Sequence, residues 1–282
     1  MGNKIFAKIE DTLQCTITQQ SMVGGGCIAQ TSIISTNQHK SYFLKQGFSG
    51  TMFQKEANGL RELSKAGAIR IPEVILADQD FLLLEHIETG IKQGGFFTNF
   101  GCSFARMHQF TGDVFGFYED NFIGSTPQVN TAMGRWTDFY FSNRLLFQYK
   151  LAEKNGYGDS SLKNAFAVIE KNIDKILDGS DEPACLLHGD LWGGNYMVDK
   201  EGEPVLIDPA VYYGHREADL AMTKLFGGFN NEFYKSYQQT YPLKDGYEYR
   251  ENIYLLYHVL NHLNLFGLSY KQQAVQLMNY YK

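Results

Sequence analysis

The 282-residue chain lacks the segments that mark a protein as secreted or membrane-bound. No apolar run approaches the roughly 20 residues that a membrane-spanning helix needs. The N-terminal stretch MGNKIFAKIE has no apolar core long enough for a signal peptide. A myristoylation motif would require Ser or Thr at the position that Phe6 occupies. We therefore expect a cytoplasmic protein that does not bind to membranes.

Positive charge is also scarce. The chain has 25 Lys and Arg residues against 31 Asp and Glu residues, which gives a formal net charge of -6, and no block of basic residues appears. A protein that binds nucleic acid normally carries a basic excess on at least one face. The charge balance therefore argues against nucleic acid and against anionic membranes as partners.

Cysteines are few and dispersed. Cys15, Cys27, Cys102 and Cys185 form no C-x-x-C pair. Neither a zinc site nor a disulfide framework is indicated, and reduced thiols fit the expected compartment. The chain also has no internal repeat and no low-complexity tract.

The patterns that are present divide the chain into two regions. In residues 1–88, the stretches SMVGGG, CIAQTSIIST and SYFLKQ predict strands, with NQHK as a turn, and EVILA and FLLLEHI predict a hairpin. After about residue 93 helical patterns dominate, interrupted by a loop at 111–135 and by the stretch around residue 190. We expect an α+β protein with a small antiparallel β-rich lobe (1–88) and a larger, mainly helical lobe (89–282).

One helix is expected inside the β-rich lobe. In TMFQKEANGLRELSKAG, four apolar residues share one helical face and Gly67 is a stop signal. The four are Phe53, Ala57, Leu60 and Leu63.

The stretch LLHGDLWGGNYMVDKEGEPVLIDPA, residues 186–210, holds the most informative polar residues. Asp190 and Asn195 have the spacing H-x-D-x-x-x-x-N, which is typical of the catalytic loop of protein kinases. In that loop the Asp receives the proton of the acceptor hydroxyl and the Asn holds a metal ion. YMVD and VLID predict strands around the turn KEGEP, which would return Asp208 to Asn195. Such a carboxylate and amide suit Mg²⁺, with ATP phosphates and water as further ligands.

The alternative interpretation of this stretch is structural. Asp190 and Asn195 would be turn residues, and Asp208 would cap a helix. The agreement of the spacing, the hairpin and the lobe order favours a phosphotransfer site.

The small lobe contains residues that such a site requires. Lys45 lies in an apolar strand, where its ammonium group needs a partner, and Glu56 on the following helix is in position to pair with it near the phosphates of ATP. The alternative is a lysine that extends along the strand edge into solvent. Gly24, Gly25 and Gly26 join two strands and would let backbone N–H groups approach phosphate, although they form neither G-x-G-x-x-G nor a Walker A loop.

The sequence resembles the fructosamine kinase (ketosamine kinase) family, which is related to aminoglycoside phosphotransferases and shares the protein-kinase-like fold. The resemblance extends nearly end to end and is most specific in HGDLWGGN (188–195) and IDPAVYYGHREADLAM (207–222). Other similar segments are GGGCI, FLK, EANGLREL, LEHI, ARMHQ, FGFYEDNFIGSTPQ (115–128) and YHVLNHLNLFG.

The resemblance implies ATP- and magnesium-dependent phosphorylation of a sugar hydroxyl on a ketosamine, free or attached to a protein. By position, Asp190 is the base, Asn195 and Asp208 hold Mg²⁺, and Asp219 braces the catalytic loop. Lys45 and Glu56 form the ion pair, and the hinge that binds adenine is Glu85, His86 and Ile87. Two alternatives remain open: a kinase for an aminoglycoside, choline or amino sugar, and a non-catalytic nucleotide-binding regulator.

Three further features have competing interpretations. Trp192 either stacks on the sugar of the substrate or packs in the core. His258 and His262 have a metal-ligand spacing but no third ligand nearby, so buried core histidines are favoured. Cys27 follows the glycine-rich stretch and is either a core residue or a redox-active thiol that joins two chains in a homodimer.

Overall fold

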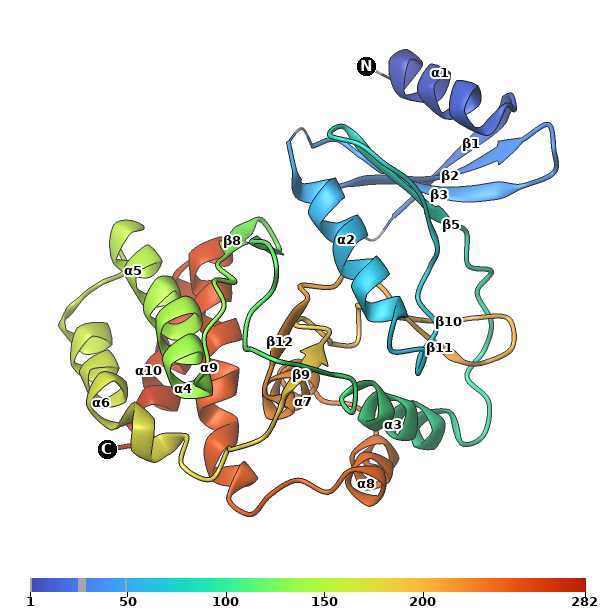
Figure 1. The fold of residues 1–282 in the computed structure, drawn as a ribbon. Helices are drawn as coiled ribbons and strands as arrows, with labels where there is room; N and C mark the ends of the chain where they lie inside the picture. Colours follow the sequence, from blue (N-terminus) through green and yellow to red (C-terminus); the bar gives the residue numbers. More distant parts are fainter. Residues whose placement is uncertain (1, 25–28, 49) are drawn as a thin grey trace.

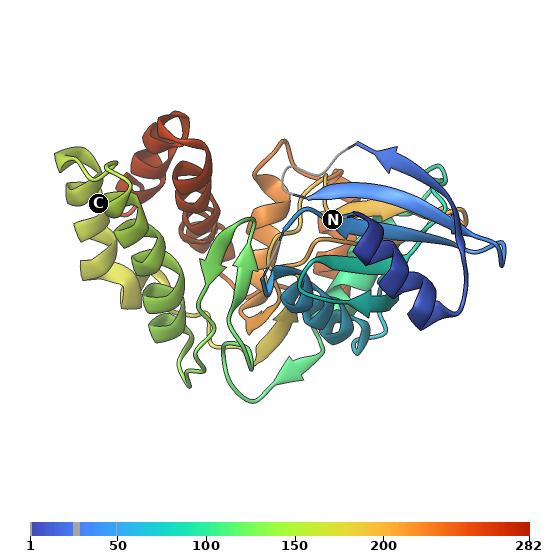
Figure 2. The same cartoon turned by 90° about the horizontal axis from the view of Figure 1, so that it is seen from above.

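The computed structural model describes residues 2–24, 29–48 and 50–282. Its N-terminal part is an antiparallel five-stranded sheet with the order β1-β2-β3-β5-β4. Helices α1 and α2 lie on opposite sides of this sheet (Figure 1, Figure 2). The elements are α1 (Gly2–Leu13), β1 (Ile17–Val23), β2 (Gln30–Thr36), β3 (Ser41–Gln46), α2 (Met52–Ser64), β4 (Val74–Ala77) and β5 (Phe81–Glu85).

Helix α1 is the one element of this part that the sequence patterns do not predict. Ile5 and Ile9 stand four residues apart on it and are buried. They pack against apolar residues of the sheet, namely Ile34, Leu44, Phe81 and Leu83. Helix α1 therefore covers the face of the sheet that would otherwise expose these side chains to water.

Helix α2 agrees with its prediction. Its apolar residues Phe53, Ala57, Leu60 and Leu63 are all buried. Gly67 follows with a left-handed backbone (φ 60°), a conformation that glycine adopts at little cost where a helix ends. Helix α2 packs on strand β5 and also reaches the core of the helical part, so it lies between the two parts of the chain.

The C-terminal part is mainly helical and includes two small sheets and a hairpin. Strand order in the three-stranded sheet is β12-β9-β6, and β10 pairs with β11 as predicted. The elements are α3 (Phe96–Met107), β6 (Thr111–Gly112), β7 (Asn121–Ile123), β8 (Thr126–Gln128), α4 (Trp136–Tyr140), a π-helical turn (Phe141–Leu146), α5 (Phe147–Lys154), α6 (Ser160–Ile176), β9 (Ala184–Leu187), β10 (Tyr196–Val198), β11 (Pro204–Leu206), β12 (Tyr212–Gly214), α7 (Arg216–Lys224), α8 (Asn231–Thr240), α9 (Tyr247–Phe266), a 3₁₀ turn (Leu268–Tyr270) and α10 (Lys271–Asn279).

The expected loop at 111–135 is therefore wrong in part, because it contains the short strands β6, β7 and β8. The β7–β8 hairpin is not predicted because three of its four buried positions are polar. Asn121, Thr126 and Gln128 are at most 5% exposed. The alternation of apolar and polar residues that normally reveals a strand is absent here.

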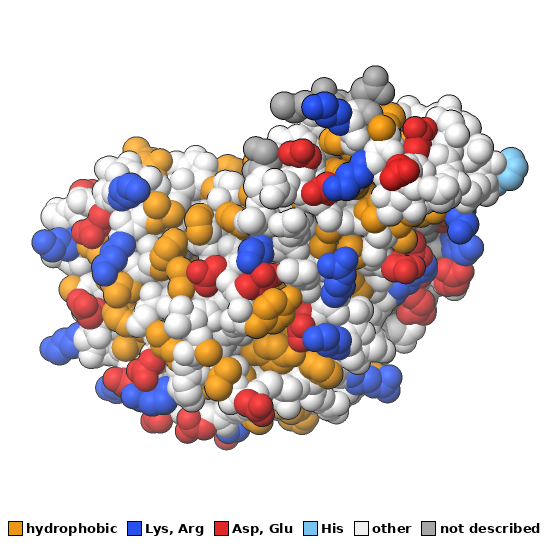
Figure 3. Space-filling view, turned by 45° about the horizontal axis from the view of Figure 1, so that its top comes forward, with side chains coloured by type: hydrophobic (Ala, Val, Ile, Leu, Met, Phe, Trp, Pro, Cys, Tyr) orange, Lys and Arg blue, Asp and Glu red, His pale blue; other side chains and the backbone are white. Residues whose placement is uncertain are grey.

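In the part of the chain that the structure describes, no helix is both long enough and apolar enough to cross a membrane. On the face shown in Figure 3, acidic and basic side chains are interspersed and form no large patch of one sign (Figure 3). The boundary at residue 88 lies between the end of β5 and the start of α3 and stays a prediction.

The packing of α3 on α8 depends on a glycine. A β-carbon at Gly101 would lie 2.1 Å from the carbonyl oxygen of Phe233, which is far inside van der Waals contact. We predict that Gly101→Ala lowers the free energy of unfolding by about 2 kcal/mol or more, because the two helices must separate. Urea denaturation measures this change.

Gly94→Ala is the matched control, since a β-carbon at Gly94 would meet no atom within 4 Å. Equal stability of the two variants would contradict the close approach of α3 and α8.

Candidate active site

The loop between β9 and β10 carries the predicted base. Asn195 donates a hydrogen bond from Nδ2 to the backbone oxygen of Asp190 at 2.8 Å and another to its carboxylate Oδ2 at 3.2 Å. The Asp190 side chain therefore has a fixed orientation, while the residue remains partly exposed. The neighbour predicted for Asn195 is Asp208, and the backbone oxygen of Asp208 lies 3.5 Å from Nδ2 of Asn195.

Asp219 binds the backbone at the start of this loop. Its two carboxylate oxygens accept hydrogen bonds of 2.7 Å from the backbone N–H groups of His188 and Gly189. Gly189 has a left-handed backbone (φ 82°), and a β-carbon there would lie 2.0 Å from the carbonyl oxygen of Ala210. The loop therefore requires glycine at this position.

A buried histidine in turn supports Asp219. The Nε2 atom of His108 lies 3.2 Å from Asp219 Oδ2, and its Nδ1 atom lies 2.7 Å from the hydroxyl of Tyr237. Burial alone would raise the pKa of Asp219, but the hydrogen bond from His108, the electrostatic effects of His108 and His188, and the backbone N–H of Gly189 together outweigh it, and the pKa lies below the ordinary value. Because a carboxylate can only accept, Nε2 carries the proton and Nδ1 accepts from Tyr237.

Asp208 reaches the site at the end of the β10–β11 hairpin. The backbone N–H of Ile207 donates to the carbonyl oxygen of Asn195 at 3.1 Å, which fixes the return of the chain. Asp208 itself has a left-handed backbone (φ 54°), as do only Gln14 and His39 among the described non-glycine residues. Such a conformation costs on the order of 1 kcal/mol and persists where the surroundings impose it. Asp208 does not cap a helix, since the next helix begins at Arg216.

Lys45 joins Asp208 to helix α2. Its buried ammonium group lies 2.6 Å from Oε1 of Glu56 and also contacts Oδ1 of Asp208. Burial alone would lower the pKa of Lys45, but the charges of Glu56 and Asp208 outweigh it and raise the pKa above the ordinary value. Lys45 is therefore a permanent cation in this site. The alternative of a lysine that extends into solvent is wrong, because the residue is only 7% exposed.

The electrostatic surroundings of Asp190 make it more basic than an ordinary aspartate. Burial raises the pKa of its carboxyl group well above the usual value, the charge of Asp208 adds to the rise, and the hydrogen bond from Asn195 opposes it. A carboxylate with a raised pKa is a better proton acceptor at neutral pH. The residue thus has the property that a general base needs.

The oxygen atoms beside Asp190 fit a hard divalent cation. Asn195 uses its amide nitrogen for three contacts, to Asp190 and to the backbone oxygen of Asp208, and no described protein donor reaches its Oδ1 atom. Asp208 adds a carboxylate that is 44% exposed. Among the described residues, no group of three or more His, Cys, Asp or Glu side chains could hold a metal alone. Two oxygen ligands suit Mg²⁺, which keeps several waters and binds with substrate phosphates.

Trp192 lies at the surface beside the catalytic loop and is 36% exposed. Its ring packs at 5.4 Å from that of Phe226, which in turn lies 5.1 Å from the ring of His262. The indole ring is therefore supported on one side and open to solvent on the other. Stacking on a substrate stays a prediction.

The two histidines of helix α9 are packed side chains. His258 is 3% exposed, and His262 donates a hydrogen bond of 2.7 Å from Nδ1 to the carbonyl oxygen of His258. Neither histidine belongs to a group of metal-binding side chains in the described part of the chain. Burial lowers the pKa of His258 to about 3, so this side chain is neutral. This agrees with the favoured interpretation of core histidines.

The remaining predicted residues lie around the sheet. Gly24 follows β1, whereas Gly25, Gly26 and Cys27 lie outside the described residues. Glu85 ends strand β5 and accepts a hydrogen bond of 2.6 Å from Arg70, while His86 and buried Ile87 follow the strand. Their role as an adenine-binding hinge stays a prediction.

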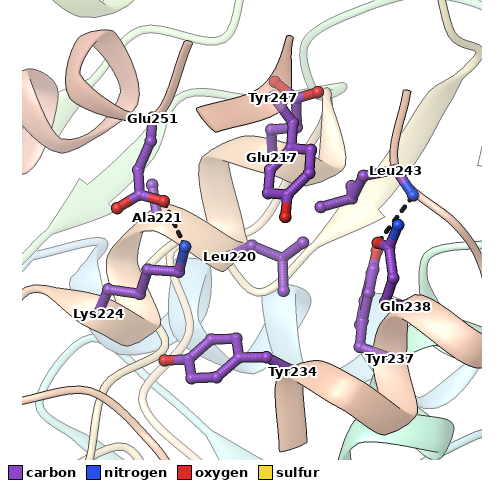
Figure 4. Close-up of a pocket in the computed structure, with 10 residues that line it drawn as sticks. All are labelled: Glu217, Leu220, Ala221, Lys224, Tyr234, Tyr237, Gln238, Leu243, Tyr247 and Glu251. Carbon is purple, nitrogen blue, oxygen red and sulfur yellow. Dashed lines mark hydrogen bonds and ion pairs between the residues drawn. The ribbon is translucent and has the colours of Figure 1, made fainter. Parts of the chain in front are cut away.

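A separate pocket of about 80 Å³ lies between α7, α8 and α9 (Figure 4). None of the predicted site residues lines it. Its charged groups are already paired, since Lys224 contacts Glu251, and Glu217 accepts from Arg250 at 2.6 Å. The charged side chains that line this pocket are therefore held by ion pairs. It is lined by Glu217, Leu220, Ala221, Lys224, Tyr234, Tyr237, Gln238, Leu243, Tyr247 and Glu251.

Comparison with known sequences identifies the family. A sequence model described as fructosamine kinase matches residues 1–282. The chloroplastic protein-ribulosamine 3-kinase of Arabidopsis thaliana is 40% identical over 274 residues, which cover 94% of this chain and 83% of the relative. The chain belongs to the fructosamine kinase family. The resemblance stated from the sequence is thereby confirmed, whereas a cytoplasmic location stays a prediction.

Solved structures confirm the predicted two-lobed, protein-kinase-like α+β fold. A crystal structure named "putative fructosamine-3-kinase" from Thermobifida fusca has a TM-score of 0.90 at 27% identity, covering 99% of this chain and 98% of that one. A ternary complex of a thermostable mutant of aminoglycoside phosphotransferase APH(4)-Ia with AMP-PNP and hygromycin B has a TM-score of 0.65 at 13% identity, covering 99% and 96%. The second likeness concerns the fold alone.

Several residues that support the site were missed by the sequence analysis. Arg70 joins Glu85 to Asp199 of the β10–β11 turn, with distances of 2.6 and 2.8 Å, and Glu119 contacts helix α2. No local pattern marks an ion pair between residues 129 positions apart. For Glu119 a signal was present, because it belongs to the segment FGFYEDNFIGSTPQ that carries the family resemblance.

The raised pKa of Asp190 predicts a stability change. The folded state favours the protonated carboxyl group, so this residue costs stability once the pH exceeds its folded pKa. We predict that Asp190→Asn increases the free energy of unfolding at pH 7 by about 1 kcal/mol. The gain should shrink towards pH 4, where the wild-type carboxyl group becomes protonated. Urea denaturation at both pH values measures it, and a variant that is less stable than wild type at pH 7 would contradict the electrostatic account.

Proposed function

We propose that this chain transfers the γ-phosphoryl group of ATP to a sugar hydroxyl of a ketosamine, a sugar joined to an amine by glycation. Family membership supports the substrate class. The observation that carries the chemistry is the Asp190 carboxylate, oriented by Asn195 and made more basic by its surroundings. In this proposal, residues 1–88 bind ATP and residues 89–282 bind the acceptor and supply the catalytic residues.

Each residue of the site has a role in this reaction. Asp190 accepts the proton of the attacking hydroxyl group and orients it towards the phosphorus atom. Lys45, held by Glu56, offers a permanent positive charge to the phosphate oxygens. Asn195 and Asp208 would hold Mg²⁺, which neutralises phosphate charge when it is bound.

The proposed binding site for ATP includes several parts of the small lobe. Gly24, Gly25 and Gly26 would approach the phosphates, and Glu85, His86 and Ile87 would contact adenine. A solved phosphotransferase with the same fold binds AMP-PNP, which supports ATP as the donor. The homodimer linked through Cys27 stays a separate proposal, with no described contact that bears on it.

The alternatives differ in the acceptor or in the presence of chemistry. A kinase for an aminoglycoside, choline or amino sugar would use the same base and ion pair. A non-catalytic regulator would require the machinery to be broken, yet Lys45, Glu56 and Asp208 are present and in contact. The family of this chain therefore favours the ketosamine.

Two substitutions separate base catalysis from nucleotide binding. Asp190→Ala should lower kcat by about 10²- to 10⁴-fold and leave the Kd for ATP nearly unchanged, because the base contacts the acceptor and not the nucleotide. Asp208→Ala should weaken the binding of Mg²⁺ and ATP as well as turnover. Kinase assays and calorimetric titration measure both. Near-normal turnover of Asp190→Ala would rule out this residue as the base.

The acceptor is tested with a panel of glycated lysines, free fructose, aminoglycosides and choline. We expect kcat/KM for fructosyl-lysine to exceed that for free fructose by about 10-fold or more, since a cationic amine is attracted to a site rich in carboxylates. Equal values for the two acceptors would overturn the ketosamine assignment. A clear preference for choline or an aminoglycoside would support the corresponding alternative.

A further inference from the structure

The segment 119–130 has no role in the chemistry above, although it overlaps the family-specific stretch FGFYEDNFIGSTPQ. It begins just before the β7–β8 hairpin and ends just after it. Its side chains contact two parts of the active site that are far apart in the sequence: helix α2 and the residues that follow Asp208.

Glu119 contacts helix α2 with both carboxylate oxygens. Lys55 donates to Oε2 at 2.6 Å, and Asn58 donates to Oε1 at 2.9 Å. Lys55 and Asn58 stand three residues apart and therefore lie on one side of the helix. Glu56, the partner of Lys45, lies in the same helical turn. The position of that turn, and with it the reach of Glu56, is thus fixed from the helical part of the chain.

The hairpin holds the chain just beyond Asp208. Asn121 donates from Nδ2 to the carbonyl oxygen of Val211 at 2.7 Å, and Gln128 donates from Nε2 to the carbonyl oxygen of Ala210 at 3.0 Å. The N–H group of Ala210 in turn donates to the carbonyl oxygen of His188 at 2.9 Å. These bonds hold the chain two and three residues beyond Asp208.

The polar groups of the segment are buried and connected. Asn121, Gln128 and Asn130 are between 1% and 5% exposed. Asn130 donates to the backbone oxygen of Glu119 at 3.0 Å and to Oδ1 of Asn121 at 2.9 Å, and it accepts from Arg144 at 2.7 Å. The amide groups of Asn121, Gln128 and Asn130 are thus paired, whereas Nε of Arg144 is buried without a hydrogen-bond partner. Paired buried amides favour one geometry, because moving them would leave polar groups unpaired.

Helix α2 meets the 209–213 stretch directly as well. A β-carbon at Gly59 would lie 3.2 Å from Cγ2 of Val211, so the helix packs closely on that chain. The hydroxyl of Tyr213 donates to Oε1 of Glu62 at 2.9 Å. Segment 119–130 therefore contacts both partners of an existing junction between α2 and the chain after Asp208.

We propose that Glu119 is a positioning residue for phosphoryl transfer. It fixes helix α2 so that Glu56 holds Lys45 beside Asp208, while Asn121 and Gln128 of the same segment fix Asp208. The ion pair is then assembled by contacts within the chain. The proposal rests on the proposed function for turnover, whereas its effects on ATP binding and on α2 do not.

The test is Glu119→Ala, which removes both contacts to α2. We expect kcat/KM for ATP to fall about 10-fold and the Kd for ATP to rise, with KM for the ketosamine within about twofold of wild type. Amide hydrogen exchange of residues 52–64 should accelerate at nearly unchanged Tm. A merely structural role would instead lower the amount of active enzyme and affect both substrates alike. If Glu119→Ala does not fold, Glu119→Gln is measured in its place and should show a smaller effect of the same kind.

Charge exchange provides a rescue. Lys55→Glu and Glu119→Lys should each lower kcat/KM for ATP, and the double variant should recover part of the loss because the ion pair is restored. Asp78→Ala is the matched control: it removes another ion pair of the small lobe, between Asp78 and Lys8 of helix α1. This variant should leave both substrates' constants unchanged.

Two results would overturn the proposal: a folded Glu119→Ala with wild-type kcat/KM and Kd for ATP, or unchanged exchange in α2. A wild-type protein that phosphorylates no acceptor would refute the proposed function instead. In that case the Kd for ATP and the exchange of α2 still decide the role of Glu119.

Discussion

The ammonium group of Lys45 is the charge around which the two parts of the chain meet. It lies on a strand of the small sheet and contacts a carboxylate on helix α2 and another at the end of the β10–β11 hairpin. A buried cation without partners is very costly, so these three elements must be placed correctly at the same time. The contacts of Lys45 with Glu56 and Asp208 that join the two parts also assemble the charged groups that would face ATP. Stability and chemistry therefore depend on one contact.

The polar residues of the helical part extend this constraint away from the site. Asp219 accepts hydrogen bonds from the backbone of the catalytic loop and from His108. His108 in turn accepts a hydrogen bond from the hydroxyl of Tyr237. The carboxylate of Asp219 is kept charged by its hydrogen bonds, whereas burial and the charge of Asp208 raise the pKa of Asp190. The pKa values of these two aspartates thus shift in opposite directions. Asp219 stays charged and binds the backbone of the loop, whereas Asp190 becomes a better proton acceptor.

Sequence reasoning was strongest where a pattern is local and apolar. The strands of the sheet, the buried face of α2 and the β10–β11 hairpin follow from alternation, helical period and turn residues. The turn in that hairpin also predicts the return of Asp208 to Asn195. It was weakest where burial is polar or contacts are distant. The β7–β8 hairpin buries Asn121 and Gln128, so its residues read as a loop. The contact between Glu119 and Lys55 joins residues 64 apart, which no local pattern reports.

The left-handed backbone of Asp208 has a consequence for how this position can change during evolution. Few residues other than Gly, Asn and Asp tolerate that conformation at low cost. Asn and Gly would keep the backbone but lose the negative charge that Lys45 contacts, and Glu would keep the charge but adopt the backbone less readily. Chemistry and conformation together leave aspartate as the one residue that meets both demands. Any substitution at this position therefore loses either the charge that Lys45 contacts or a backbone conformation that the residue adopts at low cost.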